Sequence, residues 1–203
     1  MRSLSEIETT VKRASRAVGY SWGVAEEVGK STRILELFGL PGIKHINQYY
    51  EDKKIKKFEN LNLISKKNLS SSKPFCPVIL GISFLDQVKT IENLKKIQFN
   101  NVAYPIIFLS FLSRASEIIG KKIYIKINKN EFLLNFNVNI CTDIINKEFP
   151  ELGENIEIEF RENHDNFTES EWKNLYKLSE NTFVEESDSL KQGAAGAGLT
   201  DND

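Results

Sequence analysis

The sequence predicts an α+β protein: an N-terminal helical hairpin, a mostly antiparallel sheet packed on one long buried helix, and a C-terminal helix followed by a glycine-rich tail. Two observations lead to this prediction. Residues 101–120 are apolar around most of a helical circumference, so that helix must be packed on several sides. Residues 123–127 and 132–140 alternate apolar with polar side chains, which is typical of strands with one buried and one wet face.

The N-terminal part of the chain is expected to form three helices. A capping box begins at Ser3 or Ser5, and apolar residues then recur at helical spacing. Ser21 is suited to cap a second helix over residues 22–38, and the short connection predicts an antiparallel pair. Residues 43–63 mix apolar residues with lysines and predict a third, amphipathic helix.

The middle of the chain is expected to hold a loop, a buried strand and the central helix. Residues 65–74 are rich in Lys, Asn and Ser, which favours a flexible loop. Residues 78–85 are a continuous apolar run of strand length, consistent with a strand buried on both faces. Residues 88–99 fit a short helical turn, a strand, or both. The end signals expected for the central helix are Asn100 or Asn101 as cap, Pro105 in the first turn and Gly120 at the end.

The last quarter of the chain is expected to add one strand, one helix and the tail. Residues 156–160 alternate as a strand does, and Ser170 can cap a helix that runs to about residue 184. The predicted organisation is a helical region over residues 1–64, an α+β core over residues 75–185 and a glycine-rich acidic tail over residues 186–203, within one compact domain.

Charge is unevenly distributed along the 203 residues. Residues 148–203 carry 15 acidic and 4 basic side chains, whereas residues 1–147 carry 23 basic and 13 acidic ones. Such asymmetry fits an acidic tail that closes on a basic body, a nucleic-acid face, or biased coding. A lysine-rich segment over residues 43–73, with Tyr49 and Tyr50, could serve a nucleic-acid binder, but the signal is weak and we do not expect a nucleic-acid partner.

Several classes of site are not expected. Two cysteines, Cys76 and Cys141, are too few for a disulfide framework or a zinc site, and we expect both to be free thiols. Neither a P-loop nor a dinucleotide-binding motif occurs, and no histidine stands at metal-ligand spacing, so we predict no cofactor and no metal. With no visible secretory signal or membrane span, the predicted location is the cytoplasm.

The glycine-rich tail is the most unusual stretch of the sequence. Closely spaced glycines let a backbone approach a ligand or present amides to an anion, and carboxylates can bind hard cations. The alternative is an ordinary disordered chain end. The tail residues singled out are Gly193, Gly196, Gly198, Asp201 and Asp203.

The remaining candidate residues lie on predicted helices. Arg114 and Ser110 share one stripe of the central helix, and a buried arginine is suited to clamp a carboxylate or phosphate. The alternatives are an internal ion pair between Arg114 and a nearby carboxylate, or a stripe that is simply the solvent edge of the helix. Glu26, Glu27 and Asp86 are the acid–base candidates, with Trp22 near the first two, although acids early in a helix often only complement its dipole.

Six short stretches resemble a bacterial family of unknown function, DUF3726, and together they extend along the whole chain. They are Ser3–Glu8, Trp22–Glu27, Gly39–Gly42, Cys76-Pro77, Arg114-Ala115 and Gly196–Asp203. The resemblance implies no reaction, because the family has no established activity. It does imply that the tail is a motif and favours a docked tail over a disordered one.

We therefore expect a binding or accessory protein whose glycine-rich tail docks on its own body or on a partner, which includes a protein partner or a second copy of the chain. The alternative is an enzyme that acts on a small anionic metabolite, with Arg114 as the anion clamp and a carboxylate as acid or base. A pocket lined by Arg114 and two carboxylates would favour the enzyme.

Overall fold

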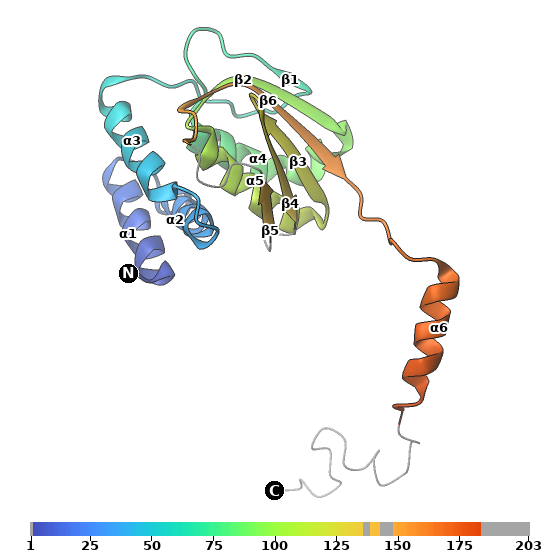
Figure 1. Ribbon diagram of the computed structural model, residues 1–203. Coiled ribbons are helices and arrows are strands. Elements are labelled where there is room, and N and C mark those ends of the chain that lie inside the picture. The colour runs from blue at the N-terminus through green and yellow to red at the C-terminus, as the bar shows by residue number, and fades with distance from the viewer. Residues whose placement is uncertain (1, 136–138, 143–147, 184–203) are drawn as a thin grey trace, which may run out of the picture. The chain divides into compact units, whose positions relative to one another are not determined.

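The computed structural model of the protein describes residues 2–135, 139–142 and 148–183. The chain divides into two compact units, residues 1–163 and residues 164–203. Within the described residues, the first unit holds five α-helices and a six-stranded sheet, and the second holds one helix (Figure 1). The predicted α+β class is confirmed.

The N-terminal helices are α1 (Leu4–Ala17), α2 (Trp22–Leu37) and α3 (Gly42–Ile55). The predicted caps of the first two are present, because the hydroxyls of Ser3 and Ser21 accept hydrogen bonds from backbone amides of the first turns. The third helix ends earlier than predicted. Backbone bonds of Glu59 to Pro74 and Cys76, at 2.9 and 2.8 Å, draw the following residues into an extended path instead.

The sheet has the strand order β1-β2-β6-β3-β4-β5. Its strands are β1 (Lys67–Asn68), β2 (Lys96–Ala103), β3 (Lys122–Ile127), β4 (Asn130–Asn135), β5 (Asn139–Thr142) and β6 (Leu152–Arg161). Every pairing is antiparallel except that of β1 with β2, so the predicted antiparallel character is confirmed. The predicted loop over residues 65–74 contains β1. Residues 88–99, which fitted more than one element in the sequence, lead into β2.

One predicted strand is two strands. Asn135 of β4 pairs with Asn139 of β5 in antiparallel register, so the chain reverses within residues 132–140. Residues 136–138 lie outside the described part. Alternation of apolar and polar residues continues through the reversal, which is why the pattern alone indicated one long strand.

The largest correction concerns residues 78–85, which form a helix and not a strand. Helix α4 (Pro77–Ile91) begins with Pro77 in its first turn, and the Cys76 thiol accepts a hydrogen bond from the Ile79 amide at 3.4 Å. It continues as the short 3₁₀ helix η1 (Glu92–Leu94). A fully apolar run does not distinguish a buried strand from a buried helix, because neither has a polar face to set the period.

The central helix is α5 (Pro105–Ile119), and 11 of its 15 residues are buried. Its predicted end at Gly120 is confirmed, with a left-handed φ of 64°. The predicted cap is wrong: Asn100 and Asn101 belong to β2, and Tyr104 precedes the helix with a φ of 44° and no side-chain capping bond. The strand thus turns sharply into the helix at a residue that is strained there.

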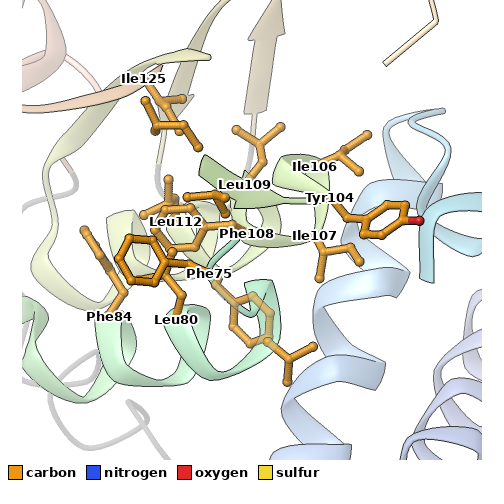
Figure 2. Packing of buried hydrophobic residues seen from close by; sticks show 14 of the residues in the cluster. Phe75, Leu80, Phe84, Tyr104, Ile106, Ile107, Phe108, Leu109, Leu112 and Ile125 are labelled. Atoms are coloured by element: carbon orange, nitrogen blue, oxygen red, sulfur yellow. The ribbon is translucent and has the colours of Figure 1, made fainter. Parts of the chain in front are cut away.

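The core lies between α4, α5 and one face of the sheet. Phe108 of α5 has its ring centroid 5.7 Å from that of Phe84 on α4 and 5.6 Å from that of Phe99 on β2. Figure 2 shows Leu80 and Phe84 on one side of α5 and Ile125 of β3 on the other. The opposite face of the sheet is polar, and Lys96 there forms an ion pair with Glu157 at 3.0 Å.

The helix of the second unit is α6 (Glu169–Glu180). Thr168 and Glu171 form a reciprocal capping box, so the predicted cap at Ser170 is wrong by two residues. None of its residues is buried, and its apolar residues are about half exposed, including Trp172 at 51%.

Close packing of α4 on α5 gives a direct test of this arrangement. A Cβ at Gly81 of α4 would overlap the Phe111 ring, whereas one at Gly23 of α2 would meet nothing within 4 Å. We predict that Gly81→Ala destabilises the protein by roughly 1–3 kcal/mol through overpacking. Gly23→Ala should be neutral or stabilising by up to about 1 kcal/mol, since alanine favours the helix. Urea midpoints that moved equally in both variants would contradict this packing.

Candidate functional site

Arg114 and Glu27, two of the predicted site residues, are in contact. The guanidinium of Arg114 on α5 forms an ion pair with the Glu27 carboxylate on α2, and both side chains are mostly buried. Burial lowers the pKa of Arg114, while Glu117, Glu8 and Glu26 act in the opposite direction. Arginine stays protonated in proteins, so this pair is the internal ion pair that the sequence left open as the alternative.

Glu26 belongs to a separate set of ion pairs beside that contact. Its carboxylate lies 3.0 Å from Lys12 of α1 and 2.8 Å from Lys30. Hydrogen bonds from Lys30 and then Lys12 lower the pKa of Glu26 to about 2. A carboxylate with so low a pKa stays ionised near neutral pH and is a weak base, because a catalytic group works best with a pKa near the working pH.

The other predicted residues on the helices are dispersed. Ser110 is buried and donates to the carbonyl of Ile107 at 2.7 Å, within its own helix. Trp22 is 57% exposed at the start of α2, and Asp86 is exposed on α4. Among the described residues, no hydrogen bond or ion pair joins Arg114 to any of these three.

The predicted tail residues Gly193, Gly196, Gly198, Asp201 and Asp203 lie outside the described residues. The docking of the tail therefore stays a prediction.

Within residues 2–135, 139–142 and 148–183, no three His, Cys, Asp or Glu side chains are placed to hold a metal ion. None of the described helices has the length and apolar character needed to span a bilayer.

A pocket of about 390 Å³ opens where α1 ends, α3 ends and α4 begins. We call it the lysine pocket, because Lys53, Lys56 and Lys57 line it. No acidic side chain is among its lining residues. The remaining walls come from Gly19 and Tyr20 after α1, Tyr49 of α3, Phe58 and Asn60 after α3, and Cys76 and Ile79 at the start of α4.

Local sequence explains how these walls meet. Gly19 takes a φ of 100°, which ends α1 and turns the chain into Tyr20. Tyr49 and Lys53 are one helical turn apart and share a face of α3. Cys76 caps α4, so the positive end of that helix dipole also faces the pocket.

Lys53 is held in place by neutral groups. Its ammonium donates to the carbonyl of Val18 at 3.1 Å and lies 4.1 Å from the centroid of the Tyr20 ring. Val18 is at the C-terminal end of α1, where a cation also stabilises the helix dipole. None of these contacts neutralises the charge, so Lys53 presents a fixed positive charge at the pocket.

The other two lysines differ in their partners. Lys56 forms an ion pair with Asp52 at 2.8 Å, and Asp52 also accepts a hydrogen bond from Tyr104 at 2.8 Å. The bond from Lys56, and to a smaller extent the bond from Tyr104, lowers the pKa of Asp52. Among the described residues, Lys57 has no ion-pair partner. Two of the three positive charges at the pocket are therefore not offset by a carboxylate.

The floor of the pocket is a buried polar chain. The Tyr20 and Tyr49 hydroxyls are 2.7 Å apart, and the Tyr49 hydroxyl is 3.0 Å from the Cys76 sulfur. Burial, with a smaller contribution from Cys76, raises the pKa of both tyrosines. Both phenols thus stay neutral at ordinary pH and add no negative charge beside the lysines.

The two cysteines are free thiols, as predicted. Cys76 is buried in the floor of the pocket, whereas Cys141 is exposed on β5.

Sequence reasoning did not find this pocket as a site. It identified the lysine-rich segment and the Cys76-Pro77 step, but as separate features. More than 25 positions separate Tyr20 from Tyr49, and more than 25 separate Tyr49 from Cys76. No spacing rule in the sequence connects residues so far apart. Tyr49 and Tyr50 are buried, so their rings do not form an exposed surface for stacking of bases.

Residues 2–76 match the model of a family described as "Protein of unknown function (DUF3726)". The predicted resemblance is confirmed over this segment. The DUF3726 segment contains all the lysines and tyrosines of the lysine pocket, together with Cys76. The motifs at Arg114-Ala115 and at the tail lie beyond it. No curated protein and no solved structure matches the chain.

The ion pair of Arg114 predicts different effects for two neighbouring carboxylates. Glu27→Gln leaves a mostly buried arginine without its partner and should cost roughly 1–3 kcal/mol, less than the 3–5 of a fully buried pair. Glu26→Gln removes an exposed carboxylate and should leave the urea midpoint close to that of the wild type. Equal midpoints for the two variants would contradict a structural role for the Arg114–Glu27 contact.

Proposed function

We propose that the protein binds a small anionic ligand in the lysine pocket and acts as a binding or accessory protein. The observation that carries this proposal is the uncompensated charge of the pocket. Three lysines line it, and within the described part of the chain only Lys56 is offset by a carboxylate and no acidic residue contributes to the walls. A cleft lined by one sign of charge attracts ligands of the opposite sign.

The arrangement of Lys53 supports the same proposal. A half-buried ammonium that is fixed by a carbonyl and a phenol ring loses little freedom when it binds an anion. The buried hydroxyls of Tyr20 and Tyr49 are neutral and do not repel an anion. The start of α4 adds the partial positive charge of its helix dipole. Ligand sites commonly combine such fixed polar groups with apolar walls in a preformed pocket.

Arg114 is a less suitable anion clamp than the lysine pocket. Its charge is already paired with Glu27, and Glu8, Glu26 and Glu117 contribute further negative charge around it. An anion there would have to displace a carboxylate and face the others. We therefore place the anionic ligand at the lysine pocket, and the proposal does not require a catalytic acid or base.

Binding can be measured by calorimetry with three probes: inorganic phosphate, benzoate and phenyl phosphate. We expect saturable binding of at least one probe, weakened by Lys57→Gln and by Lys53→Gln. Loss of one charged contact should raise the Kd about tenfold or more. Added salt should also weaken binding, since the attraction is electrostatic.

A matched control is available on the same helix. Lys54 is paired with Glu51 and does not line the pocket, so Lys54→Gln changes the net charge equally while leaving the site intact. Its Kd should stay within twofold of that of the wild type. Absence of binding by all three probes, or equal weakening by Lys54→Gln and Lys57→Gln, would overturn the proposal.

A further inference from the structure

We infer that the ligand of the lysine pocket is an organic phosphate monoester, whose phosphate lies at the lysines and whose apolar group lies against Phe58 and Ile79. This inference rests on the proposed function and adds the chemical class of the ligand. Three features of the pocket support it: its charge, its apolar wall and its volume.

The charge of the pocket matches a dianion. Lys56 is offset by Asp52, and the ammonium groups of Lys53 and Lys57 have no carboxylate partner among the residues that the structure describes. A phosphate monoester carries a charge of about −1.5 to −2 at pH 7, whereas a single carboxylate carries about −1. A phosphate monoester therefore balances both free lysines, and a monocarboxylate balances only one of them.

Two apolar side chains, Phe58 and Ile79, line the pocket together with the lysines. Phe58 is half-buried, and its ring packs on Tyr49 with the centroids 5.2 Å apart. Ile79 of the first turn of α4 is also half-buried and lines the same pocket. A bare anion gains nothing from such side chains, but a planar apolar group would bury its surface against them.

The volume of the pocket also accommodates more than a bare anion. Small-molecule pockets commonly enclose about 300–1,000 Å³, and this pocket, at about 390 Å³, lies within that range. A water molecule takes roughly 30 Å³ in the liquid. Inorganic phosphate, a few times larger than water, would leave most of the space unfilled, whereas a monoester with one ring fills it better.

The test compares phenyl phosphate with inorganic phosphate and benzoate, in calorimetric titrations of the full chain. Phenyl phosphate should bind at least tenfold more tightly than either of the other two. Its affinity should also fall between pH 7.5 and pH 5.5, because the second pKa of a phosphate is about 6 and the lysines stay charged. Benzoate affinity should change little over that range.

Two variants test the apolar wall. Phe58→Ala and Ile79→Ala should each weaken phenyl phosphate by at least threefold and leave inorganic phosphate within twofold. Phe58 also packs on Tyr49, so its variant is compared only if its melting temperature is retained; Ile79→Ala keeps a good helix former in α4 and provides the second measurement.

The outcomes separate this inference from the proposed function. Equal Kd values for phenyl phosphate and inorganic phosphate would overturn the inference, as would tighter binding of benzoate, while the proposal of an anion pocket would stand. Wall variants that weakened inorganic phosphate as much as phenyl phosphate would also overturn it. If none of the three probes bound, the proposed function would fail and the inference with it.

Discussion

The burial of most of α5, 11 of its 15 residues, is the constraint on which the rest of the first unit depends. The helix contacts β3 and β4 of the sheet, α4 beside it, and α2 and α3 of the N-terminal helices. A helix that is apolar around most of its circumference needs such packing on several sides. Its buried serines are compatible with this position because their hydroxyls bond to nearby carbonyls, as Ser110 does to Ile107 and Ser116 to Lys121. The sheet and the helical part therefore share one core.

The lysine pocket is connected to this core through the residue that precedes α5. Tyr104 takes a left-handed φ of 44°, a strained conformation that lets β2 turn into the helix. Its hydroxyl donates to Asp52 of α3, and Asp52 in turn pairs with Lys56 at the pocket. From the other side, Cys76 joins the start of α4 to Tyr49. The packing of α4 and α5 thus determines where the end of α3 lies, and with it the positions of the pocket lysines.

Local signals made much of the fold predictable, and long-range packing explains the errors. Ser3, Ser21 and Gly120 were identified from sequence because a cap depends on a residue and its near neighbours. The α4 segment was mistaken for a strand because burial on several sides removes the polar face that reveals a helical period. For the site, Arg114 was recognised as a buried cation, but its partner Glu27 was predicted only as an acid–base candidate. The lysine pocket depends on Tyr20, Tyr49 and Cys76 meeting in space, and no local pattern brings them together.

Native-state hydrogen exchange of α5 tests the central claim most directly. If the burial of this helix organises the first unit, the amides of Phe108, Phe111 and Leu112 should exchange only on global unfolding, with free energies equal to that from urea denaturation. The exposed helix α6 should exchange far faster. Exchange of the α5 amides by a local opening of clearly lower free energy, while the amides of β3 and β6 stay protected, would contradict the account.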